Sequence, residues 1–368
     1  EIRQYDLVHQ TEQYNLSNAA RAWIPQLAFS AQATWQTDAP NFPKELTGML
    51  AQQGLEIPGL RKDQYKVALE LNQTIWDGGK SVADKRIARA EAAEQKTMTD
   101  VDLYELEGRV DDLYFGILLL DERIAQTNLT LNLLRSNLEK VRALQRNGVA
   151  MQSDADVLEA ELLSVGQQLI QFESSCDSYR RMLGIFIGQK VGDRKLQHPS
   201  AVQPLSGESA RPELAMFAAK IDRLTAQEKM VKSSSMPRLG FFAQGYYPGL
   251  DYMQSMMNND WSWNAMLGVK LSWNFGAYYT QKNNLNKLRT SRQQVEVQRD
   301  VFLFNMNLQA AQENGDIARL RKAIADDDRI VALRRSVREA AESILRNGII
   351  DTHDLLSKIT DESTASMA

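Results

Sequence analysis

The fold class is decided by residues 261–275, which read WSWNAMLGVKLSWNF. Apolar side chains occupy every second position of this stretch, and mainly small or polar side chains lie between them. Alternation with a period of two indicates a β-strand with one apolar face. About ten such residues are enough for a tilted strand to cross a lipid bilayer. The stretch therefore predicts a membrane-spanning strand.

Three other segments alternate in the same way, namely residues 23–36, 65–76 and, more weakly, 238–247. All six tryptophans lie in or beside these four strands, which is where the aromatic girdle of a membrane barrel lies. The predicted girdle residues are Trp23, Trp35, Trp76, Trp261, Trp263 and Trp273.

A soluble β-sandwich would show the same alternation, so it is the alternative to a membrane sheet. Two observations disfavour it: only four strands are visible, and the long helices of the remaining chain offer them no conventional apolar cover. Four strands are too few to close a barrel, since known outer membrane barrels begin at about eight. Several chains must therefore share one barrel.

Two stretches without proline predict very long helices, over residues 79–146 and 278–346. The first allows one helix of about 65 residues, roughly 100 Å long. Its apolar side chains recur at alternating steps of three and four residues, which is typical of a left-handed coiled coil. This seam contains Leu103, Leu106, Val110, Leu113, Ile117, Leu120, Ile124, Thr127, Leu131, Leu134, Leu138 and Val141.

Shorter helices are expected at 1–22, 153–187 and 211–235, a truncated one at 353–368, and an irregular linker at 189–210. Residues 37–64 are expected to form a longer loop and residues 248–260 a shorter one, because each joins two strands at the end opposite the helices. Within the first loop, Pro40, Pro43 and Pro58 break helix and strand alike. The chain opens at Glu1 without methionine and stops inside a predicted helix. We therefore expect a signal peptide and some C-terminal sequence to be absent.

The predicted elements follow one order twice, which indicates an internal two-fold repeat with an offset of about 200 residues. The first repeat would span residues 1–209 and the second 210–368. Matching landmarks support it: Arg146-Asn147-Gly148 recurs as Arg346-Asn347-Gly348, and an aspartate follows each glycine by six positions, as Asp154 and as Asp354.

Each repeat also begins a strand near Pro-x-Leu, ends a strand at a glycine, continues into a long helix and has a Gly-x5-Asp turn. In this order of motifs the chain resembles the TolC-type outer membrane efflux family over nearly its whole length. The resemblance implies a mixed α and transmembrane β fold. Each subunit of a homotrimer would give four strands to one shared β-barrel, and long antiparallel coiled-coil helices would form an α-barrel across the periplasm.

The resemblance further implies a passive outer membrane exit duct of a tripartite efflux or type I secretion system, not an enzyme, and without cofactors. It would lie in the outer membrane of a Gram-negative bacterium, in contact with outer membrane lipid and with a large periplasmic portion. Its implied partners are a periplasmic adaptor (membrane fusion) protein and an inner membrane pump of the RND, ABC or MFS type. The transported substrate is not implied.

The resemblance places two functional regions at the helix tips. Adaptors would dock on the two turns, which contain Asn147, Gly148, Val149, Asp154, Asn347, Gly348 and Ile349. Aspartates after the second turn would narrow the pore aperture, and the positions concerned are Asp351 and Asp354. This chain departs from the family pattern, because the second aperture aspartate is Ser357 and the polar latch residues of the family fall at Leu345 and Ile350.

Several other functions are disfavoured by composition and spacing. The formal charge of -4 gives no basic footprint, so nucleic acid is not an expected partner. The single cysteine, Cys176, allows neither a disulfide nor a thiolate metal site within the chain. His9, His198 and His353 lie far apart in sequence and indicate surface residues. Gly78-Gly79-Lys80-Ser81 matches the end of a phosphate-binding loop, but Thr74 stands where its first glycine belongs.

Two alternatives remain open from the residues alone. The run Asp326-Asp327-Asp328 is either a lumen-facing cation site or a solvated helix face. The whole chain could instead be a periplasmic adaptor or coiled-coil scaffold without a pore, since long helical hairpins also suit docking. The aromatic, alternating strands favour the duct, because a soluble adaptor has no use for a lipid-facing surface.

Overall fold

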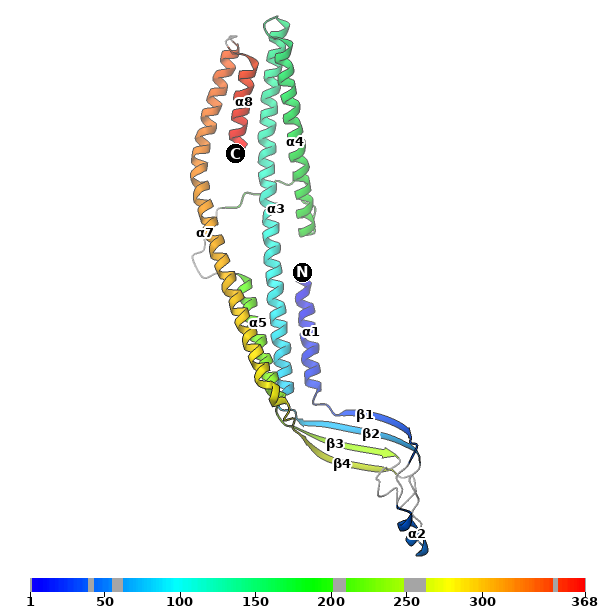
Figure 1. Cartoon of the computed structure of the whole chain (residues 1–368). Coiled ribbons are helices and arrows are strands. Elements are labelled where there is room, and N and C mark those ends of the chain that lie inside the picture. Colours follow the sequence, from blue (N-terminus) through cyan, green and yellow to red (C-terminus); the bar gives the residue numbers. More distant parts are fainter. Residues whose placement is uncertain are drawn as a thin grey trace. The chain divides into compact units, whose positions relative to one another are not determined.

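A computed structural model describes residues 2–38, 43–54, 62–200, 210–247, 263–346 and 350–367. The chain is mainly helical with one small antiparallel sheet, in agreement with the predicted mixture of elements (Figure 1). It forms two compact units, the first from Glu1–Val101 and Ala210–Asp300, the second from Asp102–Ser209 and Val301–Ala368. Each unit thus contains parts of both expected repeats, and the repeat itself stays a prediction.

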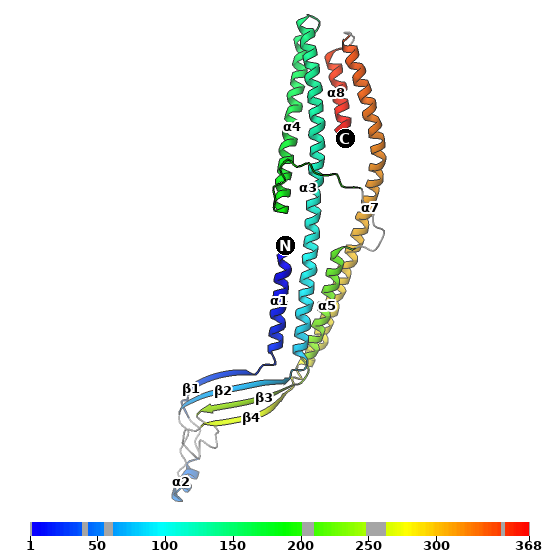
Figure 2. The same ribbon diagram turned by 180° about the vertical axis from the view of Figure 1, so that it is seen from behind.

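The first unit holds the sheet and the helical segments next to it. Its elements are α1 (Ile2–Arg21), β1 (Gln26–Trp35), α2 (Lys44–Gln52), β2 (Asp63–Trp76), α5 (Pro212–Ser233), β3 (Arg238–Tyr247) and β4 (Asn264–Ser272). The first turns of the long helices α3 (Lys80–Arg146) and α7 (Ala277–Arg346) also belong to it. The strands pair in the order β1-β2-β3-β4, all antiparallel, so β1 and β4 are the outer strands (Figure 2).

The register gives the sheet one apolar and one polar face, because residues directly opposite each other in a pair share a face. Leu27 is opposite Leu71, Leu71 opposite Ala243, and Ala243 opposite Leu267. We call this side the apolar face; it includes Leu27, Phe29, Ala31, Val67, Leu69, Leu71, Leu239, Phe241, Ala243, Leu267, Val269 and Leu271. The opposite side, the polar face, includes Gln26, Ser30, Lys66, Glu70, Asn72, Arg238, Gln244, Lys270 and Ser272.

Much of the apolar face is exposed in the single chain. The side chain of Leu267 keeps 75% of its accessible surface, and Leu27, Phe29, Leu69, Val269 and Leu271 are exposed as well. A sheet in water normally covers one face with another layer. The period-two alternation of the sequence therefore corresponds to a real two-faced sheet, and no described segment of the chain covers most of its apolar face.

Charged and hydrogen-bonded side chains attach the short helices of the first unit to the long ones. The Tyr5 hydroxyl of α1 donates a hydrogen bond to Asp100 of α3. Arg223 of α5 forms an ion pair with Glu94 of α3. Helix α5 is also bound to α7, through Arg292 and Glu228 at 2.7 Å.

The second unit is built on α4 (Gln152–Ile187), α8 (Thr352–Met367) and the remaining parts of α3 and α7. One end of the predicted α3 seam is buried here, against apolar side chains of α4, α7 and α8. The cluster consists of Leu131, Leu134, Leu138, Val141, Ala155, Leu158, Val165, Ala341, Leu355 and Ile359.

Arg180 fastens the irregular segment that follows α4. Its guanidinium forms two hydrogen bonds with Asp121 of α3, at 2.7 and 3.0 Å. It also donates to the carbonyl oxygens of Gly192 and Arg194, at 2.9 and 2.8 Å. Val191 of this segment lies in a second buried cluster with Ile117, Cys176 and Leu183.

Helix α2 is a feature that the sequence reading missed. The prolines around it led us to expect a loop over residues 37–64, yet Pro43 stands as the residue before the helix. Proline is compatible with the start of a helix, because the first turn leaves its backbone N–H groups unpaired in any case.

No helix in the described ranges combines the length and the apolar character needed to cross a membrane.

Gly78 permits the close approach between the end of β2 and the connection from α5 to β3. Its φ angle of +70° lies in the left-handed region, which side chains disfavour. A Cβ atom added at this position would lie 2.7 Å from Cβ of Met236 and 3.1 Å from the carbonyl oxygen of Pro237. The sharp turn into α3 therefore requires glycine.

We expect Gly78→Ala to lower the free energy of unfolding by roughly 2–4 kcal/mol, through backbone strain and the forced contact with Met236. Gly108→Ala is the matched control. Gly108 lies inside α3 with no atom within 4 Å of an added Cβ, so alanine should stabilise the helix by up to about 1 kcal/mol. Urea unfolding of the detergent-solubilised protein, followed by circular dichroism, measures both. Equal effects of the two substitutions would contradict this account of the turn.

Candidate functional site

The first helix tip is the turn from α3 to α4, where the sequence predicts an adaptor-docking site. Gly148 has a φ of +74° and ends α3, a conformation typical of a helix C-terminus. The backbone N–H of Val149 donates to the carbonyl oxygen of Leu144 at 3.0 Å. The side chains of Val149 and Met151 are exposed at this tip. The turn thus exposes two apolar side chains, and hydrogen bonds within the turn fix the conformation of its backbone.

Asp154 stabilises the start of α4. The sequence predicts a helix over residues 153–187, and α4 begins one residue earlier, at Gln152. Asp154 therefore lies in the first turn, and its carboxylate accepts a hydrogen bond at 2.8 Å from the backbone N–H of Met151, the residue before the helix. This is half of a capping box.

At the second tip, Asp351 and Asp354 have different surroundings. The carboxylate of Asp351 accepts a hydrogen bond from the backbone N–H of Asp354 at 2.8 Å, so Asp351 caps α8. The carboxylate of Asp354 is exposed and has no hydrogen bond or ion pair with any described residue. Asn347, Gly348 and Ile349 lie outside the described residues.

The two positions of the family's polar latch are occupied by apolar contacts. Leu345 and Ile350 pack against the buried cluster of the second unit. Leucine and isoleucine side chains carry no polar atoms, so these two residues cannot form the polar latch of the family pattern. The second unit has its ion pairs at other positions, and several of them connect α7, α8 and α3.

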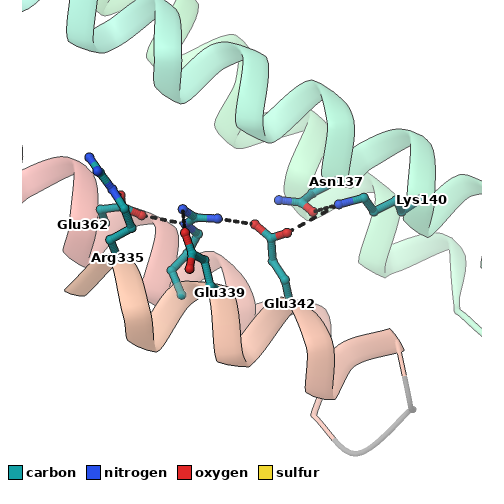
Figure 3. A network of polar contacts seen from close by, with 7 residues as sticks. Asn137, Lys140, Arg335, Glu339, Glu342 and Glu362 are labelled. Carbon is teal, nitrogen blue, oxygen red and sulfur yellow. Dashed lines mark hydrogen bonds and ion pairs between the residues drawn. The ribbon is translucent and has the colours of Figure 1, made fainter. Parts of the chain in front are cut away.

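Arg338 of α7 is the centre of an ionic network that includes Glu342 and Glu362. Figure 3 labels its partners Glu339, Glu342 and Glu362, together with Arg335, Lys140 and Asn137. The Arg338 guanidinium donates to Glu362 of α8 at 2.6 Å and to Glu342 of α7 at 2.7 Å. Glu362 also accepts from Arg335 at 3.1 Å. The side chain of Arg338 is 13% exposed and that of Glu362 11%, so this is a largely buried ion pair.

Lys140 extends the network to α3. Its ammonium group lies 3.5 Å from the second carboxylate oxygen of Glu342 and donates to the Asn137 carbonyl at 3.2 Å (Figure 3). Asn137 is 1% exposed, and its amide nitrogen has no hydrogen-bond partner in the part of the chain that the structure describes. Glu342 therefore connects the ion pairs of α7 and α8 to Lys140 of α3.

Sequence reasoning missed this network. Arg338 and Glu342 stand four residues apart, a spacing that on most helices indicates an exposed pair of small effect. The signal that distinguishes them is the third partner, Glu362, whose proximity depends on the turn between α7 and α8. Burial alone would lower the pKa of Arg338, but its hydrogen bonds to Glu362 and Glu342 outweigh this effect and raise the pKa.

Replacing Arg338 with glutamine should lower the free energy of unfolding by about 3 kcal/mol, because two poorly solvated carboxylates lose their shared cation. Arg334→Gln is the control on the same helix. Arg334 also bonds to α8, through Asp361 at 2.8 Å, but its side chain is 47% exposed, so we expect a loss below about 1 kcal/mol. Urea unfolding of each variant provides the comparison. A loss at Arg338 no larger than the loss at Arg334 would show that the network is not structurally important.

Two of the predicted girdle tryptophans lie at the end of the sheet where β2 and β4 begin. Trp35 is opposite Asp63, the first residue of β2. The ring of Trp263 lies 5.1 Å from that of Tyr247, the last residue of β3. Both tryptophans are exposed.

Three other tryptophans lie at the opposite end of the sheet. Trp23 precedes β1, Trp76 is the last residue of β2, and Trp273 follows β4. The indole N–H of Trp273 donates to the carbonyl oxygen of Ser235 at 3.0 Å. Trp261 lies outside the described residues. The described tryptophans thus form two groups separated by the length of the sheet.

The N-terminus of α3 contains the sequence that resembles a phosphate-binding loop. The carboxylate of Asp77 accepts hydrogen bonds from the backbone N–H groups of Gly79 and Ser81, at 2.9 and 2.7 Å, and from the Ser81 hydroxyl. Burial alone would raise the pKa of Asp77, but these bonds outweigh it and lower the pKa. The donors that a phosphate would need are therefore occupied by the chain's own carboxylate.

Two of the three histidines lie near a glutamate, while His353 is exposed on α8 without an ion pair to a described residue. His9 is 3.8 Å from Glu12, and His198 is 3.7 Å from Glu122. Within the described ranges, no three His, Cys, Asp or Glu side chains come together as a metal site would require. The run Asp326-Asp327-Asp328 lies on α7 with two of its side chains exposed.

Comparison with known proteins identifies the family to which these features correspond. Residues 1–188 match the family model described as outer membrane efflux protein. No curated protein sequence gives a significant match.

Several solved structures share the fold over 99% of this chain. The outer membrane protein VceC from Vibrio cholerae has a TM-score of 0.73 at 13% identity, with 87% of its chain covered. CusC, described for its folding and transmembrane channel formation, has a TM-score of 0.74 at 13% identity, with 83% covered. The open MtrE outer membrane channel of Neisseria gonorrhoeae has a TM-score of 0.63 at 14% identity, with 80% covered.

Proposed function

This chain belongs to the outer membrane efflux protein family, and we propose that it forms a passive homotrimeric channel across the outer membrane and the periplasm of a Gram-negative bacterium. In this function it is the exit duct of a tripartite efflux or type I secretion system, and it performs no chemical reaction. Substrates pass through the channel and leave unchanged.

The observation that carries the proposal is the four-stranded sheet with one exposed apolar face and one polar face. In water, the exposed side chains of Leu27, Phe29, Leu267 and Val269 would each cost free energy, because apolar surface stays in contact with solvent. In a membrane barrel the same face contacts lipid, and the polar face lines an aqueous interior. The amphipathic sheet therefore suits a channel wall.

The edges of the sheet support the inference that several copies share one barrel. No described strand pairs with the outer edge of β1 or of β4. In lipid, every backbone N–H and C=O group must find a partner within the protein. If β4 of one copy pairs with β1 of the next, the antiparallel alternation continues around a ring. The number of three copies comes from the family.

The two groups of aromatic residues support a membrane position for this sheet. From Tyr65 to Trp76, β2 advances eleven residues, or about 36 Å along the strand. A tilt of about 40° reduces this to a height of about 28 Å, close to the apolar band of about 25 Å in outer membrane barrels. Trp35 and Trp263 would lie at one interface, and Trp23, Trp76 and Trp273 at the other.

Helix α7 supplies a surface for contacts between copies in the helical part. Exposed apolar side chains within the second unit form three groups along it, spaced by three or four residues inside each group: Phe304 and Leu308; Ile317, Leu320 and Ile324; Ile330, Leu333 and Val337. In a ring of copies this seam packs against helices of the neighbouring subunit and forms the α-barrel. Apart from α2, which lies between β1 and β2, the order α1-β1-β2-α3-α4 is followed by the matching order α5-β3-β4-α7-α8, which supports an origin by duplication.

The helix tips are proposed to bind the periplasmic adaptor, which connects the duct to an inner membrane pump. The exposed Val149 and Met151 give the first tip an apolar contact surface, and Asn147, Gly148 and Asp154 hold its turn. Asn347, Gly348 and Ile349 would complete the surface at the second tip.

The alternative function is a periplasmic adaptor or coiled-coil scaffold without a pore. The exposed apolar face of the sheet disfavours it, because such a surface would make a soluble protein aggregate. A purified chain that stays monodisperse without detergent would favour the alternative.

Asp354 is proposed to line the pore aperture. Its carboxylate is free of the capping role, which Asp351 performs, so its charge is available to the pore. Three such carboxylates in a narrow ring would raise the local concentration of cations. Asp351 lies at the same tip and adds to this charge.

In planar bilayers, the wild-type protein should conduct ions, and Asp354→Asn should lower its cation-to-anion permeability ratio by about twofold or more. Asp154→Asn removes the same charge at the other tip and should leave the ratio unchanged. Unaltered selectivity in the Asp354 variant would remove this residue from the aperture. A wild-type protein without conductance would contradict the channel itself.

A further inference from the structure

The polar face of the sheet carries two neighbouring cations without a carboxylate partner. In the β3–β4 register, Arg238 is opposite Ser272 and Gly240 is opposite Lys270. Arg238 and Lys270 are therefore diagonal neighbours on one face, with their Cα atoms about 7 Å apart. Both side chains are exposed, and no described carboxylate lies within ion-pair distance of either. Two like charges so placed repel each other, and an anion between them would be favoured.

These two side chains line one cavity of about 330 Å³, all of whose lining residues belong to the first unit. The cavity also contains three charged groups of α3 and its N-terminal turn, namely Asp77, Lys80 and Asp84. Asp77 receives three hydrogen bonds at the helix N-terminus, and Lys80 lies 3.9 Å from Asp84. These hydrogen bonds leave the negative charge of Asp77 in place, so the three cations and two carboxylates of the cavity give it a net charge of +1. Arg238 and Lys270 are its two cations outside an ion pair with a described carboxylate.

The other charges on the polar face do not neutralise this pair. Lys66 adds a positive charge and lies over the ring of Tyr246, 5.3 Å from its centroid. Glu70 is the single carboxylate among the polar-face residues, and it accepts a hydrogen bond from the Asn72 amide at 3.0 Å. Glu70 stands four residues, about 13 Å, along β2 from the position in register with Lys270.

We propose that Arg238 and Lys270 form an anion-binding site that takes the carboxylate or phosphate group of a substrate in transit. The site's place inside a pore rests on the proposed function. Phe242 and Asn72 line the same cavity and offer an apolar surface and an amide beside the two cations. Arginine suits both anions, because its guanidinium forms paired hydrogen bonds with carboxylate or phosphate oxygens.

The opposition of the two faces identifies substrate, and not lipid, as the source of the anion. Lipid headgroups that accompany the apolar face lie on the other side of the sheet from Arg238 and Lys270. An anion that reaches the pair must therefore approach from the polar side. In the channel this side is the aqueous interior, where three copies would place six such cations around one cross-section.

The test uses tripolyphosphate and citrate as probes of the two anion types. In planar bilayers at low salt, where charges are poorly screened, each probe should reduce the wild-type current. In the double variant Arg238→Gln, Lys270→Gln the half-blocking concentration should rise about tenfold for both probes. Block by one probe alone would restrict the site to that anion. The charge-conserving double variant Arg238→Lys, Lys270→Arg should retain at least half of the wild-type block.

Calorimetric titration of the same probes into the detergent-solubilised proteins keeps the site separable from the channel. Binding that the glutamine variant loses and the charge-conserving variant keeps supports the site, even if the wild-type protein does not conduct. In that case the proposed channel fails and the anion site stands. The site would be overturned if the wild-type protein and the glutamine variant both conduct, are blocked at the same probe concentration and bind the probes with the same affinity. That outcome would leave the channel intact.

Discussion

The rest of the structure depends on one constraint, which is the incomplete state of the sheet in a single chain. Its outer strands β1 and β4 pair with no further described strand on their outer edges, and its apolar face is largely uncovered. An isolated sheet of this kind is unfavourable in water because of its apolar face, and unfavourable in lipid because of its edges. Association of several copies around a closed ring resolves both problems. The amphipathic strands and the exposed seam of α7 are consistent with the same ring.

In the helical part, the long helices are held together by a narrow apolar cluster and by ion pairs. Apolar side chains of four helices meet in the cluster around Leu134, Leu158 and Leu355. Beside it, Arg338 binds α7 to α8 through Glu362, while Glu342 reaches Lys140 of α3. The helix tip is thus held by two separate contacts, an apolar one at Leu345 and Ile350 and an ionic one around Arg338. Of these, only the ionic contact responds directly to pH and ionic strength.

The sequence was informative where one local pattern determines the structure. Period-two alternation predicted the strands, since a single face decides their register, and the heptad steps of α3 predicted a seam that is buried around Leu134. It was uninformative where two segments distant in the chain meet. The proximity of Glu362 to Arg338, the different surroundings of Asp351 and Asp354, and helix α2 after Pro43 depend on turn geometry that composition does not reveal.

The central claim is that one chain supplies only part of a membrane sheet, and the mass of the assembly tests it most directly. The protein should be extracted from membranes in mild detergent and its mass measured by native mass spectrometry as detergent is removed in the gas phase. The account predicts one species that contains three chains. A folded, monodisperse single chain with the same circular dichroism spectrum would contradict it, because the edges of β1 and β4 would then need no partner.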